Sequence, residues 1–466
     1  MNRAERIALT ALPLSFGSAY ALFGLLRHWR FESGAYDLAI FDQAVWHLSR
    51  LEVPASTING FDNLFGDHFH PVIALFAPLY WVAPFAETLI VAQAALLAAS
   101  IVPVFLFSQQ RLPFRTACLL SAAYGFYWGI QRTAEYDVHE LAFAPLVVAA
   151  AILWMDRGRW AWFWLAMVAL ALIKEDLIPL VGAVGLYLAV RGDWRRGGLL
   201  MGASCAAFAL VIWMVIPAFN RDTGYNYISV YDAVFARPWL LPLTLVTPLV
   251  KVRTALLWLL PFGFLTLLSP LAILLLPLAL ERLLSANQGH WGAIYHYTAP
   301  IAPIVAMGAA DGFSRLSRRF ALGRNAQTAV AGTMLVLAAI LPGHLPIWGL
   351  FEPESYHLRS RDGGARVALA AIPPDASVVA QSSVAPHLSH RRFIYVLDSR
   401  APDADYVIAC STLNPWPAGR FDELQSLLDE RRRRGYTTLL EADGWTVLKR
   451  PEAVRSRELS GMVTKY

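Results

Sequence analysis

The chain has 466 residues, of which 57% are hydrophobic and 16% are charged, and its mean hydropathy is +0.45. Soluble domains usually carry about 25% charged residues, so this composition excludes an ordinary soluble protein and indicates a helical membrane protein. A net charge of +5 over this length does not support a nucleic-acid-binding surface, and the apolar run from Leu141 to Met155 lacks the alternation of a membrane β-strand.

The first predicted element is a retained membrane span. Arg3 and Arg6 precede an apolar stretch, residues 7–26, that is long for the core of a signal peptide. A full crossing needs about 20 residues, and several later apolar runs are shorter. We expect about eleven spans, at residues 7–26, 86–108, 114–131, 141–155, 160–173, 177–190, 197–218, 254–268, 270–284, 298–314 and 326–347. Residues 71–85 contain three prolines and are expected to be half-buried without crossing.

Loops rich in arginine alternate with loops that carry acids and histidines. The positive-inside rule places the first set, which includes Arg111, Arg157 and Arg195, in the cytoplasm together with the N-terminus. We therefore expect a transmembrane domain over residues 1–349, with a large first outer loop at 27–85. An extracytoplasmic α/β domain is expected over residues 350–466.

The tail beyond residue 350 has shorter apolar runs, which is typical of a small soluble domain. Its predicted elements are buried strands at 377–380, 392–397 and 405–409, a helix at 421–434, and a hairpin that joins 437–440 to 445–448. Asp443-Gly444 is the hairpin signal. The three cysteines show no disulfide or metal-ligand spacing.

The first outer loop carries Asp37 and Asp42, with Gln43 beside the second. On a helix, five residues turn by ~500°, so the two carboxylates diverge by about 140° and do not share one ligand. One is expected to face a site while the other braces the loop. Capping of a helix by Asp37 is the alternative.

A second polar group is Asp67, His68 and His70. Carboxylate and imidazole suit a divalent ion, so these three are candidate metal ligands. In the alternative interpretation, Asp67 caps the next segment and the histidines form hydrogen bonds at the membrane interface.

A third group is Glu135, Asp137, His139 and Glu140. Close carboxylates in a medium of low dielectric raise each other's pKa and can exchange protons near neutral pH. A solvated loop is the alternative.

Lys174-Glu175-Asp176 lies between two apolar runs with almost no loop. A lysine there needs a partner, which is either one of the two neighbouring acids or a bound phosphate. Farther on, His296 and Tyr297 belong to an aromatic outer loop. Such side chains suit sugar rings, but an aromatic belt at the membrane interface explains them equally well.

Several of these segments, in this order, resemble a bacterial membrane family called domain of unknown function 2079. The resemblance extends over nearly the whole chain and rests on Tyr36–Gln43, Gly66–Pro71, Lys174–Asp176, Glu281–Ser285, His296–Pro300, Ile372–Ser377 and Pro386–His390. A small residue such as serine is more typical of the family at His70, so the resemblance does not support His70 as a ligand.

That family is similar to integral-membrane glycosyltransferases of the C-type (GT-C) fold. The resemblance implies a polyprenyl-phosphate-linked sugar as donor, a catalytic aspartate in the first outer loop, and an active site outside the cytoplasm. Asp37 best matches that aspartate. The implied location is the bacterial inner (plasma) membrane, where membrane lipids surround the chain.

Our hypothesis is transfer of that sugar to a glycan, lipid or protein acceptor, with Asp37 as general base. Lys174 and Arg132 are expected to neutralise the leaving phosphate. A divalent metal ion is a candidate cofactor. The residues expected to support substrate binding are Asp42, Gln43, Asp67, His68, Glu135, Asp137, His139, Glu140, Glu175, Asp176, His296 and Tyr297.

Two alternatives belong to other functional classes. A transporter or flippase also places charges among apolar helices, although here no inverted repeat is visible. A non-catalytic scaffold could use its tail to bind a partner. Alanine at position 37 separates the first two, because loss of glycan product indicates the enzyme and loss of solute flux with unchanged product indicates the transporter. If neither changes, while deletion of residues 350–466 abolishes complex formation, the scaffold is indicated.

Overall fold

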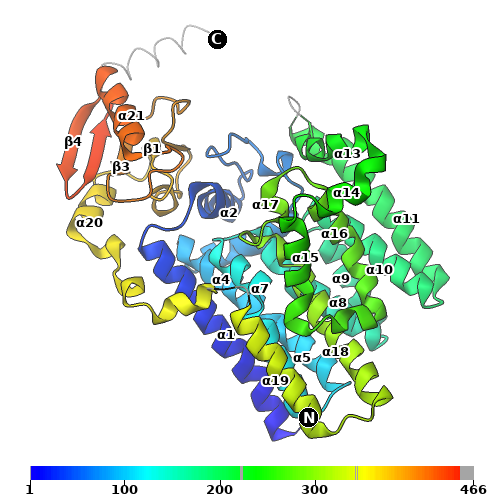
Figure 1. Cartoon of the computed structure of the whole chain (residues 1–466). Coiled ribbons are helices and arrows are strands. Elements are labelled where there is room, and N and C mark those ends of the chain that lie inside the picture. The colour runs from blue at the N-terminus through cyan, green and yellow to red at the C-terminus, as the bar shows by residue number, and fades with distance from the viewer. Residues whose placement is uncertain (1, 221–223, 342, 344, 452–466) are drawn as a thin grey trace. The chain divides into compact units, whose positions relative to one another are not determined.

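A computed structural model describes residues 2–220, 224–341, 343 and 345–451 (Figure 1). The chain divides into two compact units. Unit 1 comprises residues 1–24, 65–75 and 90–350, and unit 2 comprises residues 25–64, 76–89 and 351–466.

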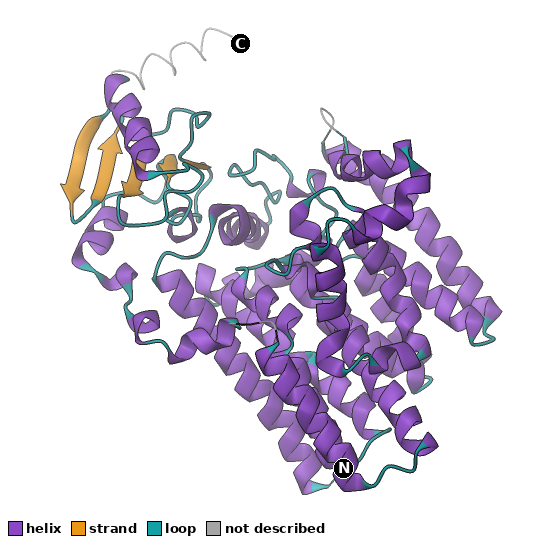
Figure 2. Ribbon diagram, viewed as in Figure 1, coloured by secondary structure: helices purple, strands orange, loops and turns teal. Residues whose placement is uncertain are grey.

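Unit 1 is helical (Figure 2). Its helices are α1 (Arg3–Trp29) and α4 (Ala86–Ala99), each of which ends or begins in unit 2, then α5 (Ile101–Gln109), α6 (Phe114–Phe126), α7 (Trp128–Glu135), α8 (Phe143–Asp156), α9 (Trp160–Ala171), α10 (Ile178–Val190), α11 (Trp194–Leu210), α12 (Ile216–Phe219), α13 (Asp232–Ala236), α14 (Leu241–Val246), α15 (Val250–Leu259), α16 (Leu275–Leu284), α17 (Gln288–Trp291), α18 (Ile301–Arg319) and α19 (Arg324–Ile340).

Small residues let these helices approach one another closely, as is common between membrane helices. A Cβ atom on Gly312 of α18 would lie 2.0 Å from the carbonyl oxygen of Leu265. Likewise, a Cβ atom on Gly185 of α10 would lie 2.7 Å from the carbonyl oxygen of Gly197 in α11. Backbone therefore packs directly against backbone in the core of unit 1.

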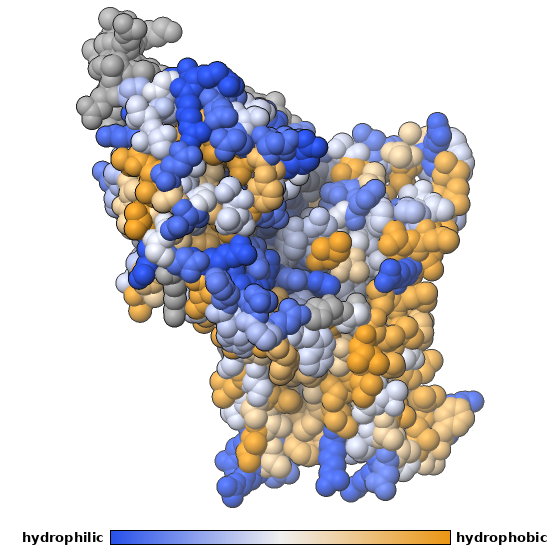
Figure 3. Space-filling model, turned by 60° about the vertical axis from the view of Figure 1, so that its left-hand side comes forward, coloured by the Kyte–Doolittle hydropathy of each residue, from blue (hydrophilic) through white to orange (hydrophobic). Residues whose placement is uncertain are grey.

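Three helical segments of the described chain are long and apolar enough to cross a membrane, namely Arg3–Trp29, Ala86–Gln109 and Trp194–Phe219. A fourth crossing is possible by length if Pro238–Val246 and Val250–Phe262, which meet at a bend of 67°, form one span. Figure 3 shows hydrophobic residues over much of the side of the helical unit and hydrophilic ones at its lower end. These features are those of a membrane protein.

The expected number of about eleven spans is not confirmed, because the structure breaks several predicted spans. Tyr127 has an extended backbone and separates α6 from α7 within 114–131. Gly263 and Phe264 have φ values of 60° and 59°, which end the helical path within 254–268. Left-handed residues cannot continue an α-helix.

Unit 2 contains a five-stranded sheet. Its strands are β1 (Val378–Ala380), β2 (Ile394–Val396), β3 (Tyr406–Cys410), β4 (Thr437–Ala442) and β5 (Trp445–Lys449), and their order is β2-β1-β3-β5-β4. The three strands β1 to β3 are parallel, whereas β5 pairs antiparallel with β3 and β4. The other helices of unit 2 are α2 (Ile40–Ser49), α3 (Ala77–Tyr80), α20 (Gly363–Ala370) and α21 (Phe421–Arg433).

The predicted small sheet domain is confirmed. Leu424 and Leu428 of α21 pack against Val407 and Leu448 of the sheet. The turn at Asp443-Gly444 has φ values of 52° and 80°, as a two-residue hairpin requires.

Residues 27–64 and 76–85 of the first outer loop fold together with the tail in unit 2, whereas residues 65–75 belong to unit 1. The backbone N–H of Ile394 in β2 donates to Thr57 Oγ1 at 3.0 Å, and the Thr57 hydroxyl donates to the Ile394 carbonyl at 2.6 Å. Gln43 Nε2 donates to the carbonyl of Arg391 at 3.0 Å. These bonds make residues 40–57 part of the same compact unit as the sheet.

Candidate functional site

Ionisable side chains gather in unit 1 where several apolar helices begin or end. Residues 136–140 precede α8, residues 174–176 lie between α9 and α10, and residues 281–297 run from the end of α16 to the start of α18 (Figure 1). We call the following set the ionic cluster: Asp67, His68, His70, Glu140, Lys174, Glu175, Asp176, Glu281 and Arg282. The structure thus brings together Asp67, His68, Glu140, Lys174, Glu175 and Asp176 of the predicted site residues.

Lys174 pairs with Glu140, which is neither of the two neighbouring acids considered from the sequence. Lys174 Nζ lies 2.9 Å from Glu140 Oε1, and the two residues are 8% and 1% exposed. Burial alone lowers the pKa of Lys174, but Glu140 outweighs it and holds that pKa well above its usual range. Burial raises the pKa of Glu140, yet Lys174 holds it well below its usual range. Both groups are therefore charged at neutral pH.

A second pair joins His68 to Glu175. His68 Nδ1 donates to Glu175 Oε1 at 2.6 Å, and the backbone N–H of Phe69 donates to Oε2 at 2.9 Å. Burial raises the pKa of Glu175, but His68 and its hydrogen bond bring it down to about 2. The Tyr225 hydroxyl also donates to Glu175, at 3.2 Å. The carboxylate therefore ties the 65–75 segment to α10.

Asp67 accepts a hydrogen bond from the Tyr227 hydroxyl at 2.7 Å, and the Tyr227 ring stacks on His68 with centroids 4.2 Å apart. The 224–231 segment therefore lies against the ionic cluster. The sequence analysis assigned no role to Tyr225 or Tyr227, since aromatic residues are ordinary in an outer loop.

His139 and His296 stack with ring centroids 3.6 Å apart, and Tyr136 lies beside them. Burial holds the pKa of His296 well below its usual range, and it lowers the pKa of His70 to about 4. Both imidazoles are neutral at pH 7. Two positively charged rings would repel in such a stack, so the neutral state of His296 favours the observed geometry.

Arg282 is the functional candidate that the sequence analysis did not select. Its side chain is 1% exposed, Nη1 lies 3.3 Å from Glu281 Oε1, and its guanidinium covers the Tyr297 ring at 4.8 Å. In the described part of the chain, Nε and Nη2 have no hydrogen-bond partner. The available signal was the charged pair Glu281-Arg282 inside an apolar run, because buried charges of this kind mark functional sites.

Lys174 and Arg282 share an electrostatic environment. Burial raises the pKa of Asp176, and both cations oppose that rise. Arg282 Nη2 lies 3.9 Å from Asp176 Oδ2. The three residues therefore form one neighbourhood in which a further anion can be held if Asp176 takes up a proton.

Arg132 and Glu135 form an ion pair with each other within α7. The backbone carbonyl of Asp137 accepts a hydrogen bond from Gln93 Nε2, whose Oε1 accepts from the N–H of His139 at 3.0 Å. Because Glu135 pairs with Arg132, the guanidinium already has a carboxylate partner. A role for Arg132 in binding phosphate stays a prediction.

Asp37, Asp42 and Gln43 of the first loop belong to unit 2. Asp37 is half-buried within Ala35–Ala39, one turn of π-helix before α2. Asp42 is fully buried and accepts hydrogen bonds from Tyr80, Ser389 and His390. The bonds to Asp42 brace the loop, and the role of Asp37 at a site stays a prediction.

Gln43 uses its side-chain amide within unit 2. Oε1 accepts from the N–H of Thr57 at 2.9 Å, and Nε2 donates to the Thr57 hydroxyl at 3.1 Å. This bonding braces the loop, as does that of Asp42.

The candidate metal ligands do not converge. Among the residues that the structure describes, no three histidine, cysteine, aspartate or glutamate side chains are placed to hold a metal ion. Asp67 contacts Tyr227 and His68 contacts Glu175, as described above.

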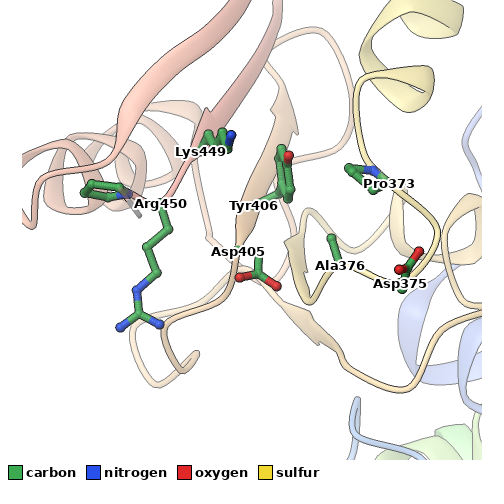
Figure 4. Close-up of a pocket in the computed structure, with 8 residues that line it drawn as sticks. Pro373, Asp375, Ala376, Asp405, Tyr406, Lys449 and Arg450 are labelled. Atoms are coloured by element: carbon green, nitrogen blue, oxygen red, sulfur yellow. The ribbon is translucent and has the colours of Figure 1, made fainter. Parts of the chain in front are cut away.

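The sheet domain has a shallow cavity of about 200 Å³ at the start of β3 and the end of β5 (Figure 4). Asp405, Tyr406 and Lys449 line it. Asp405 Oδ2 accepts from the backbone N–H and the hydroxyl of Ser377, at 3.0 and 2.9 Å. This carboxylate therefore fixes the start of β1.

Comparison with known proteins identifies a family for the chain, and the description of that family names no activity. None of the curated proteins matched the chain. A family described as "Predicted membrane protein (DUF2079)" matches residues 27–447. The match extends over both units and includes the ionic cluster, the first loop and the sheet up to Val447. The chain therefore belongs to the DUF2079 family of predicted membrane proteins.

Proposed function

We propose that the protein transfers a sugar from a polyprenyl-phosphate donor to an acceptor hydroxyl at the outer face of the bacterial inner membrane. The observation that carries this proposal is the burial of Lys174 and Arg282 together, with donors left over for an anion. A lysine ammonium group has three N–H donors. In the described contacts, the ammonium group of Lys174 pairs with Glu140. Nε and Nη2 of Arg282 form no hydrogen bond to described groups.

The surroundings of these two cations suit a lipid-borne phosphate. The helices that begin or end at the ionic cluster are apolar, which suits contact with an isoprenoid chain whose phosphate binds Arg282. Buried Arg–phosphate contacts are strong because both partners are charged and water is excluded. The carboxylates of the cluster oppose this binding, and protonation of Asp176 removes part of that opposition.

The transfer step then follows in one displacement. The acceptor hydroxyl gives its proton to the Asp37 carboxylate, and its oxygen forms a bond to the anomeric carbon. The bond between that carbon and the phosphate oxygen breaks, and the polyprenyl phosphate leaves with an added negative charge. Lys174 and Arg282 stabilise this charge. The proposal requires Asp37 to come within hydrogen-bond reach of the acceptor during catalysis.

The test uses the full-length protein in nanodiscs with undecaprenyl phosphate and, as the uncharged comparison, undecaprenol. We expect Arg282→Met to weaken undecaprenyl-phosphate binding by about tenfold or more, as for the loss of a charge-assisted hydrogen bond, and to leave undecaprenol binding unchanged. Arg111→Met is the matched control, because Arg111 pairs with Asp156 and Asp311 away from the cluster. Arg282→Lys retains the charge if the methionine variant folds poorly. If the wild-type protein binds undecaprenyl phosphate and undecaprenol equally well, the proposal of a phosphate-binding site is wrong.

Catalysis is tested separately at Asp37. Asp37→Asn is expected to retain undecaprenyl-phosphate binding and to lower formation of the cell-surface glycan product by ~10²–10⁴-fold. Unchanged product with a well-folded variant rules out Asp37 as the base.

A proton-coupled transporter is the second candidate, favoured by the titratable groups buried side by side in the ionic cluster. Chains of buried acids and histidines often carry protons across membranes. Solute flux that depends on a proton gradient in reconstituted vesicles, together with no glycan product, supports this candidate over the transferase.

A further inference from the structure

Unit 2 has a cavity of about 320 Å³ that the proposed transfer does not use. Its polar walls are formed by His28, Asp42, Glu87, His387 and His390. Liquid water occupies about 30 Å³ per molecule, so the cavity has room for about ten waters. This volume lies at the lower end of the range for small-molecule sites.

Asp42 orients His390 at this cavity. His390 Nε2 donates to Asp42 Oδ1 at 2.9 Å. The Tyr80 hydroxyl also donates to Oδ1, and the Ser389 hydroxyl donates to Oδ2, so every described bond to Asp42 holds it in place. Asp42 is 0% exposed, and it is a positioning residue rather than a group that meets a ligand.

This bond leaves the other nitrogen of His390 for a ligand. When Nε2 carries the proton given to Asp42, Nδ1 of the neutral ring is an acceptor, and it becomes a donor when the ring is protonated. Burial lowers the pKa of His390, but Asp42 outweighs it and raises that pKa above its usual value, so Nδ1 can serve a hydroxyl group in either role. Within the described chain, Nδ1 accepts no hydrogen bond. The ring is packed by Tyr80, with centroids 5.3 Å apart, and by Trp46 at 6.4 Å. It is therefore fixed in place while 27% of its side chain stays exposed.

The remaining walls provide one more acceptor and several apolar faces. Glu87 is half-buried and accepts from Trp29 Nε1 at 3.2 Å through Oε1. Pro84, Phe85 and Pro374 line the cavity beside it. Fixed acceptors next to apolar surfaces suit a ring that carries hydroxyl groups on one side and C–H groups on the other.

The cavity is also preformed. The Arg391 guanidinium donates to the backbone carbonyls of Leu388 and Pro373, and to that of Ala376 at 2.9 Å. These bonds lock the 386–391 turn that carries His390. A ligand then binds without having to order this wall.

We propose that this cavity is a binding site for a polyol of monosaccharide size, in which one ligand hydroxyl forms a hydrogen bond with Nδ1 of His390 and another donates to the carboxylate of Glu87. The site is independent of the lipid-phosphate chemistry proposed for unit 1. A free sugar or the terminal sugar of a glycan has the required chemistry.

The test uses the full chain in nanodiscs with three probes: methyl glucoside, methyl mannoside and N-acetylglucosamine. Carbethoxylation of the histidines by diethyl pyrocarbonate, read by mass spectrometry, needs no variant. We expect at least one sugar to slow modification of His390 by about fivefold or more. His357, whose side chain is 64% exposed, is the internal control and is expected to react at an unchanged rate.

Saturation-transfer NMR with the protective sugar then tests the two acceptors. Glu87→Met and His390→Phe are each expected to weaken binding by about fivefold, the effect of one lost hydrogen bond, whereas His357→Gln has no effect. Failure of all three sugars to protect His390 overturns the proposal. So does equal protection by tetramethylammonium, because that ion fills space without hydroxyl groups. The lipid-binding test at Arg282 is unaffected by either result.

Discussion

Lys174 Nζ lies 2.9 Å from Glu140 Oε1, and both side chains are almost fully buried. The pair joins the start of α8 to the turn between α9 and α10. Two charges removed from water are tolerated because each compensates the other, and removal of either one leaves an uncompensated charge in the interior.

Lys174→Met is therefore expected to destabilise the protein by about 3–5 kcal/mol, and Glu140→Gln by a similar amount. The double variant is expected to recover most of this loss, because no buried charge is then left alone. Thermal unfolding in detergent measures the effect. A double variant as unstable as the sum of the single ones contradicts this account of the pair.

Acidic pH is expected to destabilise unit 1 through His70. Burial lowers the pKa of His70 to about 4, whereas an unfolded histidine titrates near 6.5. Below pH 6.5 the unfolded state takes up a proton that the folded state does not, so the free energy of unfolding falls as pH falls towards 4. At about 1.4 kcal/mol per pH unit, the full loss is at most about 3 kcal/mol.

The measurement is the unfolding midpoint of the wild-type protein and of His70→Gln between pH 7 and pH 5. The variant is expected to lose less stability over this interval because it has no imidazole to protonate. His357→Gln, at an exposed position, is the control. Identical pH dependence in wild type and His70→Gln excludes His70 as the cause.

The sequence predicted the elements of the tail well, because their signals are local. The hairpin at Asp443-Gly444 and the helix that ends before Gly435 follow from turn chemistry and short-range periodicity. The membrane spans were predicted less well. Breaks at Tyr127 and Gly263 lie inside apolar runs, and hydropathy alone does not register a change in backbone direction.

The candidate site was predicted in part. Its acids and histidines stood out because ionisable groups are rare among apolar residues. Their partners did not, since the pairing of Lys174 with Glu140 depends on how α8 and α10 pack. The bond between Gln43 and Arg391 joins residues 348 positions apart, and no periodic pattern reports such a contact.

A methyl group on Gly312 is expected to disrupt α18. In Gly312→Ala, the new Cβ would lie 2.0 Å from the Leu265 carbonyl oxygen, so backbone must move, at a cost of about 1–3 kcal/mol or more. Gly332→Ala in α19 is the matched control, since nothing lies within 4 Å of its Cβ position. It is expected to stabilise the helix by up to about 1 kcal/mol. Equal unfolding midpoints for the two variants rule out a close helix approach at Gly312.

Membrane topology provides the last prediction, because the proposed transfer requires both units to face the outside. After replacement of Cys118, Cys205 and Cys410 by serine, Ser229→Cys in unit 1 and Ser399→Cys in unit 2 report on the two units at exposed positions. A membrane-impermeant maleimide is expected to label both cysteines in intact cells.

Arg318→Cys, at the exposed end of α18 and within an arginine-rich loop, is expected to react only after the membrane is permeabilised. Positions 229 and 399 are expected outside and position 318 in the cytoplasm, because arginine-rich loops stay on the cytoplasmic side of the membrane. Labelling of position 229 and position 399 from opposite sides contradicts the proposed transfer, because Asp37 and Lys174 then belong to units that face different compartments.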